Sequence, residues 1–433
     1  MGDAPGREPA ALGSRRRAAL PPPTLPLIYL TGAHLSLVVA FAILTARPDL
    51  PGPFFYHPKA LAVVHLVTLG GISGTILGAL YIVGPLVLGV PMRAAALDAV
   101  LCLAFWLGTT GIVAGFWSGR FELVGASAAL VLPPLGVVGG RVAIGLRSTR
   151  LPFGVTLHLW LAVANVLLAG LLGAAAAINR ATGVLPLSPM SVAAAHAHLA
   201  LLGWAAMMIL GVGYRLIPMF APGAMPTGPS VALSAVLLEI GTLGLTVSLA
   251  ADRSLLWWAI MVAAAFAAFL AQIAWTLRGR RPGPVELPKP DWSTWHSYVS
   301  MACLAVAIAL GIRVAAGGAD RATVWAYGTI GVLGFAVQMI AGIAGRLLPM
   351  QAWYRALERR DGVLPPISVH RLIEPRLAGA VLLSWLAGLP LLTIGLAGQR
   401  SFAIAFGAAA LLAATVASAW HAALIVHRAQ RAA

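Results

Sequence analysis

Long apolar stretches, separated by short polar segments, constrain the fold of this chain more than any other feature. Twelve of these stretches contain at most one charged residue each. A hydrocarbon core about 30 Å thick is crossed by a helix of about 20 apolar residues. The sequence therefore predicts an all-α polytopic membrane protein with twelve transmembrane helices. We expect them near residues 25–46, 60–84, 97–117, 123–145, 153–177, 190–217, 231–251, 255–276, 293–315, 324–349, 377–396 and 402–426.

The composition agrees with this class and excludes others. Of the 433 residues, 60% are hydrophobic and 10% are charged, and the 47 glycines allow helices to approach closely in lipid. The two cysteines, Cys102 and Cys303, both lie inside predicted helices. They form no CxxC motif, so the sequence predicts neither a disulfide framework nor cysteine-based chemistry.

The net charge of +16 follows the predicted topology. With the N-terminus placed inside, the cytoplasmic segments and the helix halves that adjoin them hold 21 of the 29 Lys and Arg residues, and the opposite loops with their adjoining helix halves hold the other eight. This bias follows the positive-inside rule. It predicts a multi-pass protein of a bacterial-type inner membrane with both termini cytoplasmic. We expect the lipid bilayer, and no nucleic acid, to be the partner of the basic residues.

Two polar regions flank or interrupt the predicted helices. Residues 1–24 are rich in Pro and Arg and lack the apolar core of a secretory signal, so we expect a disordered basic cytoplasmic tail. Residues 25–433 then form the membrane domain. The longest loop, about 350–376, contains Pro365, Pro366 and several charges, and we expect it on the cytoplasmic surface without forming a domain.

Three of the predicted helices share one pattern of glycine and proline. Each contains two glycines eight residues apart and a proline seven residues later, and the three prolines are 133 and 131 residues apart. A fixed period predicts one structural unit used three times, with four helices in each of the ranges 25–147, 148–279 and 290–428. The glycines predict close helix crossings. The pattern is carried by Gly70, Gly78 and Pro85, by Gly203, Gly211 and Pro218, and by Gly334, Gly342 and Pro349.

Histidines break this symmetry. Twenty residues before the proline, the first copy has His65 and the second has His198, whereas the third has Thr329. His196 lies two residues before His198. Because two residues correspond to about 200° around a helix, His196 and His198 face nearly opposite sides and would serve two separate sites. Histidine inside a membrane span predicts a functional site.

A family resemblance begins at this His-x-His pattern. Residues 196–204 read His-Ala-His-Leu-Ala-Leu-Leu-Gly-Trp and continue to Pro218. They resemble the haem-bearing helix of the catalytic subunits of haem–copper oxidases and nitric-oxide reductases. In that family a single His on the second helix completes a low-spin haem site. The resemblance implies twelve helices in three arcs, with His65 and His198 as axial ligands of a low-spin haem b and His196 facing a second haem or a metal.

Some features of that family are missing here. The family carries His-x-His on its tenth helix, whereas in this chain the motif lies on the sixth predicted helix. The family's copper or non-haem iron needs further histidines from its sixth and seventh helices, and the predicted helix 231–251 contains none. The sequence therefore predicts one or two haem b groups bound by His65, His196 and His198, with no copper ligands visible.

The other polar residues of the spans carry weaker predictions. His34, His158 and His296 lie in the first helix of each unit. We expect structural or interfacial roles for them, with a second layer of sites as the alternative. Glu239 is the most isolated acid of the chain, and a proton relay and a neutral carboxyl are equally consistent with its position.

Arginines inside or beside the spans suggest two kinds of contact. Arg215 and Arg346 lie three residues before Pro218 and Pro349, and we expect their side chains to extend to the lipid interface. At the outer ends of the helices, three basic residues are candidates to bind a haem propionate. These are Lys59, Arg180 and Arg321.

Three functions are consistent with these features. The favoured one is an integral membrane b-type haem protein related to haem–copper oxidase subunit I, for which an oxidoreductase activity is one option. It would transfer electrons, or bind and reduce a diatomic gas such as NO or O2, with a cytochrome or a quinol as electron donor. The alternatives are a copper-handling membrane protein without haem, since imidazole and thioether ligands suit copper, and a transporter or structural membrane subunit.

Overall fold

The structure is a computed structural model, and it describes residues 20–52, 56–184, 186 and 188–433. These residues form helices without a β-strand, and twelve spans are long and apolar enough to cross a membrane. The predicted fold class is therefore confirmed, whereas most of the predicted tail, residues 1–19, lies outside the described residues. The nine spans away from the centre are α2 (Leu25–Ala46), α5 (Ala96–Ser118), α6 with η3 (Phe121–Ser148), α7 (Phe153–Thr182), α10 (Pro229–Ala250), α11 (Leu256–Arg278), α12 (Trp292–Ala315), α15 (Pro375–Gly398) and α16 (Ser401–Arg431).

Three composite spans form the centre of the bundle. Between 67 and 83% of each of their apolar windows is buried, against at most 44% in the other nine spans described. They are also the spans that carry the glycine and proline pattern. Their segments are α3 (Pro58–His65), η1 (Leu66–Ser73), α4 (Gly74–Val83) and η2 (Gly84–Leu88); α8 (Pro189–His198), η4 (Leu199–Ala206) and α9 (Met207–Phe220); and α13 (Arg321–Thr329), η5 (Ile330–Val337) and α14 (Gln338–Arg359).

A π-helical segment of eight residues lies at the same place in each central span. Each π-helical segment begins at the residue directly after the position that lies 20 residues before the proline of its span. This position is His65, His198 or Thr329. π-Helical turns occur frequently at functional sites. The sequence pattern did not predict these segments, yet they follow its register. The wider organisation into three four-helix units stays a prediction.

The glycines of the pattern bring the central spans close to their neighbours. A Cβ atom added to Gly70 would lie 2.5 Å from Ser36 Oγ on α2, and one added to Gly203 would lie 2.8 Å from Asn165 on α7. Gly334 is equally confined by α12, with the nearest atom at 2.9 Å. These distances are shorter than normal carbon contacts of about 3.5–4.0 Å. The prediction of close helix crossings at these glycines is confirmed.

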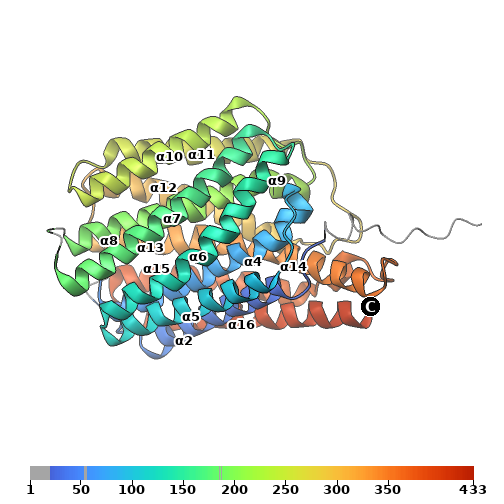
Figure 1. The fold of residues 1–433 in the computed structure, drawn as a ribbon, viewed down its shortest axis with the longest axis horizontal. Helices are drawn as coiled ribbons and strands as arrows, with labels where there is room; N and C mark the ends of the chain where they lie inside the picture. Colours follow the sequence, from blue (N-terminus) through green and yellow to red (C-terminus); the bar gives the residue numbers. More distant parts are fainter. Residues whose placement is uncertain (1–19, 53–55, 185, 187) are drawn as a thin grey trace, which may run out of the picture.

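The two ends of the bundle are distinct in Figure 1, where α8 and α13 lie toward one end and α9, α14 and the C-terminus toward the other. We call the first the histidine end, where the central spans begin at Pro58, Pro189 and Arg321, and the second the proline end. At the histidine end, Ser188 caps α8 and Asp320 caps α13. Both side chains accept a hydrogen bond from the backbone of the first turn.

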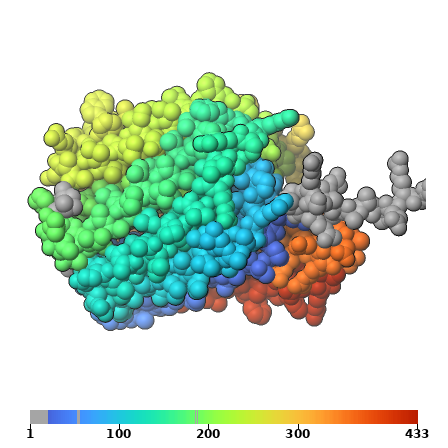
Figure 2. All heavy atoms as spheres, viewed as in Figure 1, coloured from blue at the N-terminus to red at the C-terminus, as the bar shows by residue number. Residues whose placement is uncertain are grey.

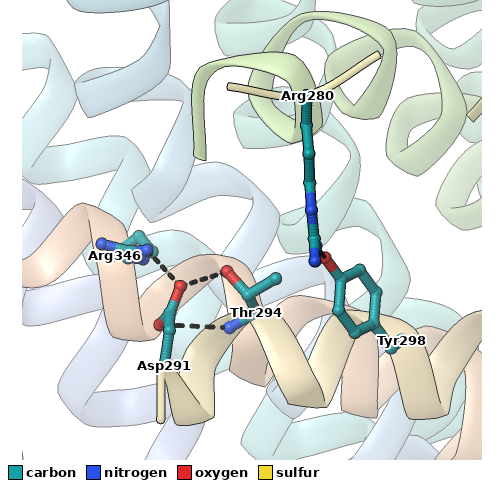
Figure 3. Close-up of polar contacts among 5 residues, drawn as sticks. All are labelled: Arg280, Asp291, Thr294, Tyr298 and Arg346. Carbon is teal, nitrogen blue, oxygen red and sulfur yellow. Dashed lines mark hydrogen bonds and ion pairs between the residues drawn. The ribbon is translucent and has the colours of Figure 1, made fainter. Parts of the chain in front are cut away.

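At the proline end, Arg346 has a buried side chain that forms an ion pair. We expected this arginine at the lipid interface, but its side chain is only 7% exposed and pairs with Asp291, which caps α12. Figure 3 shows the Arg346 guanidinium directed at the Asp291 carboxylate, which also accepts hydrogen bonds from Thr294. The prediction was wrong because it considered α14 alone, without the acid that begins the neighbouring helix.

Helix α14 is longer than predicted. The sequence predicted a loop from about residue 350, whereas the helix passes through Pro349 and ends at Arg359. A proline removes one helical hydrogen bond, so a helix that continues past it needs other support. Trp353 Nε1 donates to the backbone oxygen of Ile367 at 2.8 Å and supplies part of that support. Figure 2 shows this part of the chain, in orange, at the proline end of the surface.

Candidate functional site

Two histidine rings from different central spans face each other near the histidine end. His65 ends α3 and His196 lies in the last turn of α8. Their ring centroids are 6.4 Å apart, with 11° between the ring planes. The sequence had predicted His198 as the partner of His65, whereas the histidine ring that faces His65 in the structure is that of His196. His198 instead contacts Tyr327 of α13, on the other side of α8, as a rotation of about 200° requires.

Hydrogen bonds fix the protonation pattern of the two facing rings. His65 Nδ1 lies 2.8 Å from the backbone oxygen of Leu61, and His196 Nδ1 lies 2.9 Å from that of Ala169 on α7. A carbonyl oxygen only accepts, so Nδ1 carries the proton and Nε2 of a neutral ring keeps its lone pair. Neither Nε2 has a hydrogen-bond partner among the described residues. Metal-binding histidines typically have this arrangement, with the other nitrogen donating to an oxygen.

The separation of the rings suits one metal ion between them. A metal–imidazole bond is about 2 Å long and a ring nitrogen lies about 1.2 Å from its centroid, so two rings on opposite sides of one ion have centroids about 6.4 Å apart. The observed centroid separation of 6.4 Å suits such an ion provided that the two Nε2 atoms point toward each other. In the described part of the chain, no group of three or more His, Cys, Asp or Glu side chains could hold a metal ion. Further ligands would therefore have to come from a bound molecule.

Both histidines line a cavity of about 280 Å³, bounded mainly by the first two central spans together with α5, α6 and α7. This volume is close to the range of about 300–1,000 Å³ for small-molecule sites, and it is far larger than a single ion needs. The wall is mainly apolar, and small residues of α7 and α8 leave room for a flat molecule. These small residues are Gly170, Gly173, Ala174, Ala177, Ala193 and Ala197.

Residues of two further helices position the rings. A Cβ atom added to Gly173 of α7 would lie 2.7 Å from His196 Cε1, so the absence of a side chain there makes room for the imidazole. The His65 ring lies 4.8 Å from the Phe116 ring of α5, which is an aromatic contact. Sequence reasoning missed Gly173 and Phe116, because no local pattern links them to a histidine on another helix.

One of the three basic residues proposed to bind a carboxylate lines this cavity. Arg180, in the last turn of α7, lines its wall, and the guanidinium carbon lies 5.4 Å from the Phe121 ring centroid. Lys59 lies over the Trp117 ring instead, at 5.6 Å, and neither Lys59 nor Arg321 lines the cavity. Arg180 is therefore the residue best situated to bind an anionic group of a molecule in the cavity.

His198 and Tyr327 form a closed pair. The Tyr327 hydroxyl lies 3.3 Å from His198 Nε2, and His198 Nδ1 lies 2.8 Å from the backbone oxygen of Ala194. Because Nδ1 donates to the carbonyl, Nε2 accepts the hydrogen bond from the hydroxyl. Both ring nitrogens therefore have partners. For His198 to bind a cofactor, as the sequence predicted, this hydrogen bond would have to break.

Two of the three histidines in the first helices of the units have partners on both nitrogens. His34 Nε2 lies 3.1 Å from Ser418 Oγ, and His158 Nε2 lies 3.3 Å from Ser234 Oγ. Each Nδ1 is bonded to the carbonyl four residues earlier in the same helix. These contacts agree with the structural role expected for both. His296 differs, because its buried Nδ1 has no hydrogen-bond partner.

Glu239, near the middle of α10, is paired with a neutral amide. Asn165 Nδ2 of α7 donates to Glu239 Oε2 of α10 at 2.7 Å. An amide can donate to an ionised or a protonated carboxyl. The contact is therefore compatible with both roles that the sequence left open.

Comparisons with known proteins do not assign a function to the chain. The resemblance to haem–copper oxidases and nitric-oxide reductases rests on the pattern in residues 196–218 and on the helix number, and it stays a prediction. No protein-family model matches the chain, and no curated protein matches it.

Proposed function

We propose that this chain is an integral membrane haem protein in which His65 and His196 are the axial ligands of one b-type haem. The observation that carries the proposal is the facing pair of rings, 6.4 Å apart, with both residues lining one cavity. A tetrapyrrole brings four nitrogen ligands of its own, so two histidines complete a six-coordinate iron. A site of this kind needs no third protein ligand.

Each part of the cavity would have a role in holding such a group. The carbonyl oxygens of Leu61 and Ala169 would orient the two imidazoles and make them more basic ligands. The small residues of α7 and α8 would lie against the flat ring, and the apolar walls would keep water away from it. Arg180 would bind a propionate through charge-assisted hydrogen bonds.

Electron transfer is the function that this ligand set favours. A bound haem supplies one-electron chemistry, and two histidine ligands leave no open position for a gas. NO or O2 would bind only if one of the two imidazoles left the iron. We therefore prefer electron transfer to gas reduction, with a cytochrome or a quinol as the donor.

A pyridine haemochrome assay on the purified protein tests this proposal. The wild type is expected to contain one haem b per chain, with the low-spin optical and EPR spectra of bis-imidazole iron. His65→Ala and His196→Ala should each lose these spectra, whereas His34→Ala, a histidine outside the cavity, should keep them. A wild type without haem, or unchanged spectra in both cavity variants, would remove the proposal.

A copper ion is the second candidate, because the ring separation also suits one Cu(I) ion between two imidazoles. The size of the cavity favours haem over this alternative. Elemental analysis of the same preparations distinguishes the two. About one copper per chain without haem absorption, lost in His65→Ala, would favour copper, whereas iron in proportion to haem would exclude it.

A further inference from the structure

An apolar groove of about 840 Å³ runs along α2 beside α5, and its lining residues differ from those of the histidine cavity. Its lining extends from Thr24, the residue before α2, to Val39 of that helix, which corresponds to about 22 Å at 1.5 Å per residue. Ile28 and Leu35 of this stripe are 52% and 61% exposed. Because α2 is one of the membrane spans, the natural contact of this exposed apolar surface is a lipid chain.

A glycine opposite an indole shapes the groove. A Cβ atom added to Gly32 would lie 2.3 Å from Trp106 Cζ2. The Trp106 ring of α5 therefore lies directly against the backbone of α2. Because Gly32 has no side chain, the surface of α2 is recessed at this position. Leu35 and Ile28 stand on either side of Gly32 along α2. The groove thus results from close packing of Trp106 on Gly32, rather than from loose packing of α2 and α5.

One end of the groove reaches two arginines on the extended part of α14. Arg355 lines the groove, and with Arg359, four residues later, it also lines an adjoining depression of about 10 Å³ that shares Leu27 with the groove. Neither arginine forms an ion pair with another described residue. The nearby N-terminus of α2 has no side-chain cap at Thr24 and adds positive potential through the helix dipole.

We propose that the groove, with the two arginines at its end, binds one anionic phospholipid. The phosphate would accept hydrogen bonds from Arg355 and Arg359, and one acyl chain would lie over Gly32 and Trp106. Arginines near a membrane surface attract anionic lipids, whereas a zwitterionic lipid would bring its own cation to a site that already holds two. This proposal is independent of haem binding, because the groove and the histidine cavity share no lining residue.

Native mass spectrometry of the purified full chain, incubated with phosphatidylglycerol and phosphatidylcholine of identical acyl chains, tests this site. The wild type should retain one phosphatidylglycerol in preference to phosphatidylcholine. The double variant Arg355→Ala/Arg359→Ala should lower the phosphatidylglycerol-bound fraction at least about tenfold. The control Arg278→Ala/Arg281→Ala, which removes the same charge from exposed residues at the same end, should leave it unchanged.

A second variant tests the apolar part of the site. Thr31 is exposed and lines the groove, so Thr31→Trp should fill it and lower the retention of both lipids. Circular dichroism and size-exclusion chromatography establish that each variant is folded. Equal retention of the two lipids by the wild type, equal losses in the two double-arginine variants, or full retention by Thr31→Trp would each overturn the proposal.

Discussion

Two ring pairs at the histidine end, His65–His196 and His198–Tyr327, have the same geometry and different chemistry. In each pair, a residue 20 positions before the proline of one central span faces a residue 22 positions before the proline of the next. The ring centroids are 6.4 and 6.0 Å apart, and the ring planes differ by 11° and 22°. The helices therefore bring two rings together twice, at equivalent positions.

The similarity extends to the helices behind the rings. A Cβ atom added to Gly173 of α7 would lie 2.7 Å from the ring on α8, and one added to Gly311 of α12 would lie 3.1 Å from the ring on α13. Each glycine follows the buried histidine of its helix, His158 or His296, by 15 residues. The space for the second ring of each pair is thus made in the same way.

The difference lies in one residue and in the space beside it. His196 keeps its Nε2 lone pair free and lines a cavity of about 280 Å³ with His65. Tyr327 instead offers a hydroxyl 3.3 Å from His198 Nε2, and this contact closes the pair. The backbone thus sets where two rings meet, whereas the identity of the second ring decides whether a ligand can enter.

The largest difference that we expect between the two pairs is in haem content. His196→Ala removes a proposed axial ligand, so nearly all haem should be lost. Tyr327→Ala changes the equivalent residue of the closed pair and should leave one haem per chain. Haem per protein, measured by pyridine haemochrome on both variants beside the wild type, gives the comparison. Equal haem loss in the two variants would contradict the distinction between an open and a closed pair.

The next largest difference concerns the two glycines behind the rings. Gly173→Ala forces a methyl group toward His196 Cε1, so the imidazole must move. Changes that disturb the orientation of a metal ligand typically weaken binding about 10–100-fold, and we expect a loss of haem affinity in that range. Gly311→Ala should leave haem affinity unchanged. Titration of the haem-free variants with haemin measures both, and equal affinities would show that Gly173 does not position the ligand.

Much of the fold could be predicted from the sequence, because membrane helices are defined by local composition. The lengths of the apolar stretches gave twelve spans, and the glycine spacing gave close helix crossings. The rotation of about 100° per residue also predicted that His196 and His198 lie on opposite faces of their helix. Each of these inferences uses only residues within one helix, where periodicity fixes direction.

The site required information from several helices. The partner of His65 depends on which side of α8 faces α3, and this is a property of helix packing that no spacing encodes. The π-helical segments η1, η4 and η5 shift the register of the central spans without a local signal. The continuation of α14 to Arg359 is likewise supported by a hydrogen bond from Trp353 to the loop that follows the helix.

A smaller difference is expected in stability. Tyr327→Phe keeps the ring and removes the hydrogen bond to His198, and we expect a loss of about 0.5–1 kcal/mol in the free energy of unfolding. Haem content should not change. Tyr298→Phe removes an exposed hydrogen bond from Arg280 and should cost less. Denaturant unfolding in detergent measures both variants, and a larger loss in Tyr298→Phe would argue against a closed His198–Tyr327 pair.

The smallest difference concerns pH at the caps of α13 and α8. Asp320 accepts hydrogen bonds from the Thr323 side chain and backbone, at 2.6 and 3.0 Å, and lies 3.5 Å from Arg313, which together lower its pKa from 3.8 to about 2. Because the pKa is lower in the folded state, the stabilisation by this cap is complete above about pH 4 and is lost as the pH falls toward 2. Ser188, which caps α8, does not titrate in this range.

Hydrogen exchange in the first two turns of the helices tests this difference. Between about pH 4 and pH 2, protection in α13 should fall relative to that in α8, because only the α13 cap takes up a proton. In Asp320→Asn, which lacks the charge at every pH, the ratio of the two protections should stay constant across this range. A parallel fall at both helices in the wild type would mean that the pH response belongs to the whole bundle. The two ring pairs would then still differ in ligand binding, but the helices α8 and α13 that carry them would not differ in their response to pH.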